Sequence, residues 1–465
     1  MSLLRTRATA RTGAAALGLA LVAALATTTS AQADPAYSTY TGTTSDGSHV
    51  QARVPSNWNG TLLIYSHGYR QAGDPTTGAG AAAKTATDSY SAGVGSQLLS
   101  EGYAIAGSSY GRNGFASLDG VRADELLYSW FKTKAGSPSK LIVWGDSLGG
   151  LVTQLFAEKH PELVKGTLQL AAVVGGTVRN FDLALDYEVM VKKLIDPTLK
   201  LTNYSSYSQA MSAFMHAYTT ITTALASSDN SVKARMVSRL LAIQLLLDGP
   251  AKSKSFDGVG LTNAVSAAVE TVASGLYYAT VDRYELEQRV GGNPSTNVGI
   301  DYRHRVSAAD LTRYASFGFG TSLLQSYAQT VQSYGTRVTA NSTARAKLAA
   351  LGTPTGKLTV PTVNLHTAYD PLVIVQNQKV FSGLVAAAGK SALLQTLITV
   401  PPATYVGPAA YGAGHDNFTD AEVIGALHGL ISWSNSGTRP VASSWPTAMG
   451  AEVSTSYPVA SWPAR

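Results

Sequence analysis

Short apolar runs recur along the first part of the chain at lengths typical of β-strands, at residues 49–54, 61–66, 103–109, 141–145 and 167–174. Stretches with helical spacing of apolar residues lie between the later runs, at 124–136 and 151–166. Strands that alternate with helices predict a mostly parallel sheet covered by helices on both faces. The pattern therefore indicates an α/β fold.

The pattern changes after Val174. Between about residues 176 and 355 apolar residues recur at helical spacing, for example at 211–226, 232–249, 261–281 and 321–334, so we predict helices throughout this segment. Strand signals return at 357–367 and 393–400, and a last helix is predicted at 419–433. We interpret residues 34–175 and 356–436 as one α/β domain, interrupted by a helical cap at 176–355 and followed by a tail at 437–465 that packs on the core.

The first 33 residues have the layout of a secretory signal peptide. Three arginines precede an apolar stretch at residues 13–26, and the segment ends in Ala-Gln-Ala. The apolar stretch is shorter than the roughly 20 residues that a membrane-spanning helix needs. We therefore expect cleavage after Ala33, an extracellular protein, and no membrane contact after cleavage.

Charge and cysteine content narrow the function further. Removing the peptide lowers the formal net charge from +6 to +3, and the remaining basic residues are scattered. This pattern does not favour nucleic acid as a partner. The chain has no cysteine, which excludes disulfides, thiol nucleophiles and thiolate metal sites. We expect no metal and no other cofactor, and the sequence assigns no oligomeric state.

One short motif carries the candidate chemistry. Gly145-Asp146-Ser147-Leu148-Gly149 fits the pattern G-x-S-x-G, and it lies between a predicted strand and a predicted helix. A serine on such a tight turn needs a positive φ angle and small neighbours, which Gly145 and Gly149 provide. We predict Ser147 as a nucleophile and the backbone N–H of Leu148 as a donor to an oxyanion.

A serine nucleophile needs a base, and an acid to orient that base. Among the eight histidines, His415 lies in a glycine-flanked loop just before the last predicted helix, so we predict it as the base. Asp370 is the only acidic residue between Asp310 and Asp416, and it follows a predicted strand. We predict it as the acid, while Asp182 and Asp186 remain alternatives.

A second oxyanion donor is expected near the end of an early strand. Gly68 follows His67 there and permits close backbone approach, so the N–H of Tyr69 is our candidate. His67, Asp146 and His366 are further candidates for a substrate pocket.

Together these residues resemble the α/β-hydrolase superfamily, in the chain order Ser147, Asp370, His415, in the elbow motif, and in residues 67–69. The resemblance implies an eight-stranded, mostly parallel sheet, a cap between core strands six and seven, and an acyl-enzyme mechanism without metal. It assigns Ser147 as nucleophile, His415 as general base and then acid, and Asp370 as its orienter. One departure from the superfamily is the wide spacing between Asp370 and His415, and the extra length lies in residues 400–414. This segment is either a substrate-binding loop or a sign that a strand is misplaced in our prediction.

Two substrate classes remain open. The predicted cap is rich in uncharged residues and tyrosines, which favours a hydrolase of apolar or aromatic esters; these are Tyr204, Tyr207, Tyr218, Tyr277, Tyr278, Tyr284 and Tyr302. An exopeptidase acting on short peptides would need carboxylates for a free amino group, and Asp282, Glu285 and Glu287 lie in the cap. Arginines alternate with these acids, so a solvated, ion-paired helix face is the other interpretation. A non-catalytic protein is disfavoured, because all three candidate catalytic residues are present.

Overall fold

The protein is described by a computed structural model that covers residues 36–247, 249, 252–407, 410–449 and 453–465. The predicted signal peptide, residues 1–33, lies outside the described residues, so secretion stays a prediction. In the part of the chain that the structure describes, no helix combines the length and the apolar composition needed to span a bilayer.

One sheet organises the core, and within the described residues it contains nine strands in the order β1-β2-β4-β3-β5-β6-β7-β8-β9. β3 to β8 run parallel to one another, whereas β2 and β9 pair antiparallel with their neighbours. The strands are β1 (Tyr37–Thr43), β2 (His49–Pro55), β3 (Thr61–Ser66), β4 (Ala104–Ser108), β5 (Lys140–Asp146), β6 (Val164–Leu170), β7 (Thr362–Thr367), β8 (Leu394–Thr399) and β9 (Val453–Ser454).

This is an α/β-hydrolase fold, with one correction to the predicted sheet. Eight strands were expected, and the ninth is the two-residue β9, which the tail contributes. It pairs antiparallel with β8 at the edge of the sheet, where an uncovered strand would expose unpaired backbone groups. The alternation of apolar and helical segments thus predicts the fold class correctly.

Side chains that alternate along the central strands pack against helices on opposite faces of the sheet. Ile142 and Trp144 of β5 belong to the same cluster as α1 (Ala92–Ser100) and α13 (Asp420–Ser436). Leu141 and Val143 pack with α2 (Ser117–Ala135) and α3 (Leu148–Lys159). A further helix, α12 (Gln376–Ala387), follows β7, and a short 3₁₀ turn, Ser391–Leu393, precedes β8. Side chains on both faces of β5 are therefore buried from solvent, and this packing holds the carboxyl end of the strand in place.

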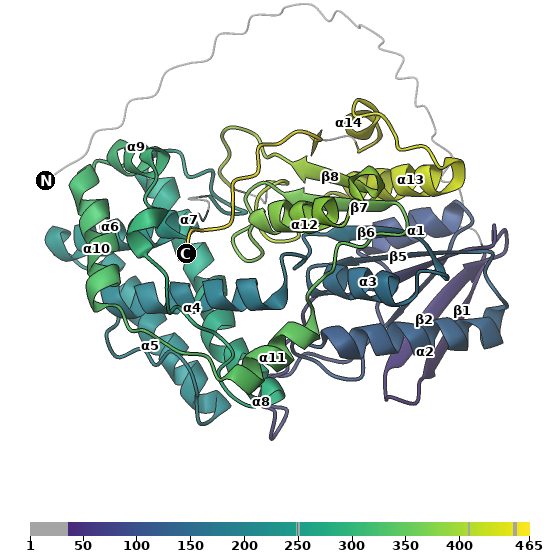
Figure 1. The fold of residues 1–465 in the computed structure, drawn as a ribbon, viewed down its shortest axis with the longest axis horizontal. Helices are drawn as coiled ribbons and strands as arrows, with labels where there is room; N and C mark the ends of the chain where they lie inside the picture. The colour runs from purple at the N-terminus through teal and green to yellow at the C-terminus, as the bar shows by residue number, and fades with distance from the viewer. Residues whose placement is uncertain (1–35, 248, 250–251, 408–409, 450–452) are drawn as a thin grey trace, which may run out of the picture. The chain divides into compact units, whose positions relative to one another are not determined.

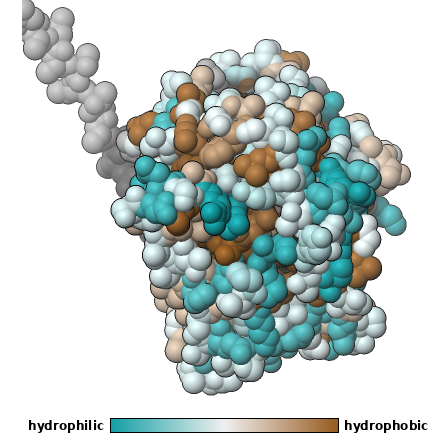
Figure 2. Space-filling model, turned by 90° about the vertical axis from the view of Figure 1, so that its left-hand side faces the viewer, coloured by the Kyte–Doolittle hydropathy of each residue, from teal (hydrophilic) through white to brown (hydrophobic). Residues whose placement is uncertain are grey.

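Helices fill the chain between β6 and β7 and gather at the end of the sheet where the parallel strands terminate (Figure 1). They are α4 (Thr177–Leu194), α5 (Tyr207–Ala226), α6 (Asn230–Leu246), α7 (Gly260–Tyr277), a π-helical turn (Tyr278–Asp282), α8 (Arg283–Val290), a 3₁₀ turn (Tyr302–Arg305), α9 (Ala308–Ser316), α10 (Thr321–Tyr334) and α11 (Ser342–Leu351). Hydrophobic side chains lie among polar ones on this face of the molecule (Figure 2). We refer to residues 177–351 as the helical insertion, and its status as a separate cap remains a proposal.

The tail after α13 contacts both parts of the chain. Its helix α14 (Ser444–Met449) packs on α13, and β9 joins the sheet. The last residues instead reach the helical insertion, where Arg305 Nε donates to the carbonyl of Ala464 at 3.0 Å and Arg465 lies 3.3 Å from Asp182. The first half of the tail thus contacts α13 and the sheet, and its last residues contact the helical insertion.

Candidate active site

Ser147 sits at the sharp turn between β5 and α3. Its φ is +52° and its ψ is −118°, a conformation that non-glycine residues rarely adopt. The turn leaves no room beside it, because a Cβ at Gly145 would lie 2.4 Å, and one at Gly149 1.9 Å, from the carbonyl oxygen of Ser66. Glycine at both positions lets the elbow approach β3 and lifts Ser147 above the end of the sheet.

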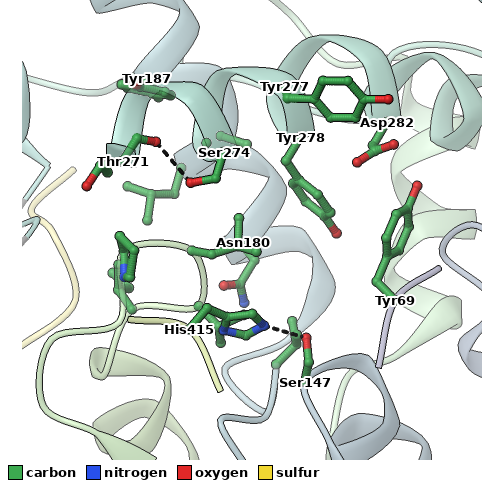
Figure 3. A pocket seen from close by; sticks show the side chains of 18 of the residues that line it. Tyr69, Ser147, Asn180, Tyr187, Thr271, Ser274, Tyr277, Tyr278, Asp282 and His415 are labelled. Atoms are coloured by element: carbon green, nitrogen blue, oxygen red, sulfur yellow. Dashed lines mark hydrogen bonds between the residues drawn. The ribbon is translucent and has the colours of Figure 1, made fainter. Parts of the chain in front are cut away.

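Three predicted residues from separate parts of the chain meet at this point. His415 Nε2 lies 2.8 Å from Ser147 Oγ (Figure 3). His415 Nδ1 lies 2.7 Å from Asp370 Oδ2. With the imidazole proton on Nδ1, His415 donates to the carboxylate and accepts the serine hydroxyl proton. The arrangement has the geometry that a Ser-His-Asp triad requires.

Asp370 is held so that one oxygen stays available for His415. The side chain is fully buried, and its Oδ1 accepts the N–H groups of Leu372 and Val373, both at 2.9 Å. Burial alone would lower the pKa of His415, but the adjacent Asp370 charge and its hydrogen bond outweigh that effect and raise it. The carboxylate therefore stabilises the imidazolium that forms when His415 takes a proton.

The two predicted oxyanion donors lie beside the serine. Within the described residues, neither Leu148 N–H nor Tyr69 N–H donates to another protein group. The backbone before Tyr69 comes close to the elbow, since a Cβ at Gly68 would lie 3.3 Å from Ser147 Cβ. Two free donors near the nucleophile are what an oxyanion hole needs, and their role stays a prediction.

A cavity of about 510 Å³ opens above Ser147 and His415 (Figure 3). Its lining is mostly apolar and aromatic, and it comes from both the sheet end and the helical insertion. The insertion contributes Asn180, Phe181, Tyr187, Thr271, Ser274, Tyr277, Tyr278 and Asp282. A cavity of this size suits a small-molecule substrate.

The three predicted pocket residues have different positions. Asp146 lines the cavity, and Tyr65 Oη donates a hydrogen bond to it. His67 and His366 do not line it, which corrects the expectation for both. His67 follows the last residue of β3 and is buried. Its ring stacks on that of Tyr110, with 3.9 Å between the ring centroids.

His366 is fully buried behind the acid. Its Nε2 donates to the carbonyl oxygen of Val373 at 2.7 Å, and Gln378 Nε2 donates to its Nδ1 at 2.9 Å. Burial lowers its pKa and outweighs the opposing effect of Asp370. A neutral histidine here fixes the turn that carries Asp370.

The alternative acids, Asp182 and Asp186, lie on α4 and are occupied elsewhere. Asp182 forms a salt bridge with Arg345 at 2.9 Å, and Asp186 forms one with Arg305 at 2.5 Å. Neither contacts His415, so the geometry favours Asp370 as the orienting acid.

The three cap carboxylates also separate. Glu285 accepts from Arg289 Nε at 2.7 Å, and Glu287 accepts the N–H of Asn203 at 2.6 Å. Both are buried, so the interpretation of a solvated helix face is wrong for them. Asp282 alone among the three lines the cavity.

Sequence reasoning missed Asn180 and Asp416, which also line the cavity. Asp416 has a φ of +51° directly after His415, and Tyr90 Oη donates to its carbonyl oxygen at 2.6 Å. Burial, followed by the nearby Asp146 carboxylate, raises the pKa of Asp416. The position of Asp416 directly after His415 could have indicated that it lines the site. No feature of the nearby sequence indicates this for Asn180. The described residues contain no group of three or more His, Cys, Asp or Glu side chains that could hold a metal ion.

No protein-family model and no curated protein matches the chain. Among solved structures, it is similar to feruloyl esterase B from Aspergillus oryzae, with 13% identity and a TM-score of 0.43 over 87% of this chain and 82% of that chain. It is also similar to an esterase from Aspergillus oryzae, with 15% identity and a TM-score of 0.41 over 85% of this chain and 78% of that chain. A third similar structure is an esterase from Exiguobacterium antarcticum, with 12% identity and a TM-score of 0.34 over 85% of this chain and 99% of that chain. We base the function on the geometry of the site itself.

Proposed function

We propose that the protein is a serine hydrolase that cleaves carboxylic esters through an acyl-enzyme intermediate. The observation that carries this proposal is the hydrogen-bonded chain from Ser147 Oγ through His415 to Asp370, at the floor of a cavity. We further propose that residues 1–33 direct secretion and that the helical insertion acts as a cap over the site.

Acylation begins when Ser147 Oγ attacks the ester carbonyl carbon and its proton passes to His415 Nε2. The carbonyl oxygen becomes an oxyanion, which the N–H groups of Leu148 and Tyr69 stabilise. The carbon–oxygen bond to the leaving alcohol then breaks, and His415 Nε2 returns its proton to the alkoxide. The acyl group remains on Ser147.

Deacylation repeats these steps with water. His415 removes a proton from the water as its oxygen attacks the acyl carbon, and the oxyanion forms again beside Leu148 and Tyr69. When the bond to Ser147 Oγ breaks, His415 returns the proton to Ser147 and the carboxylic acid leaves. Asp370 keeps its charge throughout and stabilises the imidazolium at both stages.

The cavity supports an apolar or aromatic ester as substrate. Phe115, Leu148, Val173 and Phe181 provide its apolar walls next to the serine. Burial of apolar substrate surface there contributes about 25 cal/mol per Å².

A chromogenic ester series with the Ser147→Ala variant tests the proposal. We expect the variant to keep its thermal unfolding midpoint and to lose at least about 10³-fold in kcat, because Ser147 supplies the hydroxyl that His415 Nε2 contacts. A fluorophosphonate should label the wild-type protein at Ser147. Labelling at a different residue, or unchanged turnover by the variant, would contradict the assignment.

A further inference from the structure

Asp282 lies at the end of the π-helical turn, where α7 passes into α8. Its carboxyl faces the cavity across from His415 (Figure 3), and the residue is half-buried. A π-helical turn often marks a functional position, since it shifts the side chains that follow it relative to the helix face. The mechanism proposed above gives this carboxyl no task.

Asp282 lacks the cationic partner that its neighbours have. Arg283 pairs with Glu188 at 3.0 Å, and Arg289 pairs with Glu285 at 2.7 Å. Within the described residues no basic side chain forms a salt bridge with Asp282, and the cavity lining contains no lysine or arginine. A half-buried carboxyl without a counter-ion is still costly to ionise, and desolvation raises the pKa of Asp282 to about 7.

Tyrosines surround the carboxyl on the cavity side. Tyr69 directs its hydroxyl toward Asp282, and its ring meets that of Tyr278 edge to face at 5.4 Å (Figure 3). Aromatic faces next to a carboxylate are the surroundings in which proteins hold an ammonium group. A cation in this position would contact both the ring faces and the charge.

The other cavity carboxyls are less available. Tyr65 donates a hydrogen bond to Asp146, and burial, followed by the nearby charge of Asp146, raises the pKa of Asp416. Asp146 and Asp416 therefore lie close together in the part of the cavity beside His415, whereas Asp282 lies near the hydroxyl of Tyr69 and the charge of Glu285.

We propose that Asp282, together with the rings of Tyr69 and Tyr278, binds a positively charged nitrogen in the acyl part of the substrate. The inference rests on the proposed hydrolysis of esters and adds the substrate class, namely cationic acyl esters. Tyr69 links the two places, because its backbone N–H is the candidate oxyanion donor and its hydroxyl lies at Asp282. The distance from the nitrogen to the scissile carbonyl is therefore comparable to the length of a tyrosine side chain. This places the nitrogen a few bonds along the acyl chain.

Two esters of equal shape test this. The p-nitrophenyl ester of 4-(trimethylammonio)butyric acid carries a fixed charge, and that of 5,5-dimethylhexanoic acid is its uncharged isostere. We expect the ratio of kcat/KM, cationic over neutral, to fall about 10- to 100-fold in Asp282→Asn. Asp282→Glu, which keeps the charge, should restore part of the ratio. Glu270→Gln, on α7 but outside the cavity lining, is the matched control and should leave the ratio unchanged.

The pH dependence gives a second readout. Neither ester titrates, so the ratio cancels the titration of His415 and reports the charges near the nitrogen. In the wild-type protein the ratio should rise as pH increases through about 7, because Asp282 becomes charged. The rise should be absent in Asp282→Asn. An equal loss of turnover for both esters, with the ratio unchanged, would overturn the proposal and leave Asp282 a structural role.

A binding arm separates this inference from the proposed function. The methyl esters of the two acids are titrated calorimetrically into Ser147→Ala and into Ser147→Ala/Asp282→Asn. Tighter binding of the cationic ester that depends on Asp282 supports the site, even if the wild-type protein hydrolyses neither ester. Equal binding of both esters by Ser147→Ala overturns it, whatever the catalytic result.

Discussion

Replacing Asp370 by asparagine removes a charge while keeping the shape of a buried side chain. The asparagine carbonyl would keep the two backbone N–H bonds that Leu372 and Val373 donate at 2.9 Å. Its NH₂ group would then face His415 Nδ1, where Asp370 Oδ2 now lies at 2.7 Å. Two donors cannot face each other, so His415 must carry its proton on Nε2. In that tautomer it cannot accept the proton of Ser147.

The size of the effect follows from the charge and the tautomer together. A carboxylate and an imidazolium with charge centres about 4 Å apart attract by about 4 kcal/mol at an effective dielectric of 20, which corresponds to roughly 10³ in rate. Restoring the productive tautomer adds a further cost. We therefore expect kcat to fall by about 10³- to 10⁴-fold.

The assay is steady-state hydrolysis of a p-nitrophenyl ester across a range of pH. With Asp370 neutralised, the effect of burial on the pKa of His415 is opposed less strongly, so the acid limb of the profile should also move to lower pH. Asp182→Asn is the matched control, because it breaks the salt bridge with Arg345 and leaves the triad intact. A kcat within tenfold of wild type for Asp370→Asn, or a larger loss for Asp182→Asn, would refute the reasoning.

Further outcomes are expected for the pH profile and for substitutions of three glycines. In the wild-type protein kcat/KM for a neutral ester should fall as pH drops through a midpoint above histidine's ordinary 6.5, because only neutral His415 accepts a proton and its pKa is raised; a midpoint below 6.5 would contradict this. Gly149→Ala should lower the thermal unfolding midpoint and abolish fluorophosphonate labelling, since its Cβ would lie 1.9 Å from the Ser66 carbonyl. Gly429→Ala should destabilise the protein by about 1–3 kcal/mol in denaturant titrations, because its Cβ would lie 2.2 Å from Trp445, whereas Gly383→Ala, with open space around it on α12, should stabilise it by about 0.5–1 kcal/mol.

The sequence predicts best those elements whose burial alternates or repeats. β3 and α10 occupy the residues that the apolar pattern predicts, 61–66 and 321–334. β1 was missed because it is an edge strand with mostly exposed side chains, so no alternation marks it. α4 lies in the segment predicted to be helical but was not singled out, for the opposite reason. Its buried face includes Asp186 and Glu188, and a sequence pattern does not identify charged residues as buried. In the structure they are paired with Arg305 and Arg283.

The candidate site divides in the same way. Ser147, Asp370 and His415 could be predicted because each depends on local chain chemistry, namely a glycine elbow, a turn after a strand and a glycine-framed loop. The walls of the cavity could not, since they depend on how the helical insertion folds back over the strand ends. Asp282 is the clearest example: three carboxylates lie within six residues, and only tertiary contacts separate it from Glu285 and Glu287.

The wide spacing between Asp370 and His415 has a structural use. The predicted strand at 393–400 is present as β8, so strand misplacement does not explain the extra length. The described residues of 400–414 do not line the cavity, which argues against a substrate-binding loop. They bond instead to the helical insertion: Tyr405 N–H donates to Asp257 Oδ2 at 2.9 Å, and Gly407 N–H donates to the carbonyl of Ser255 at 3.2 Å. The loop that presents His415 is thus joined to the insertion that covers it, so displacing one strains the other.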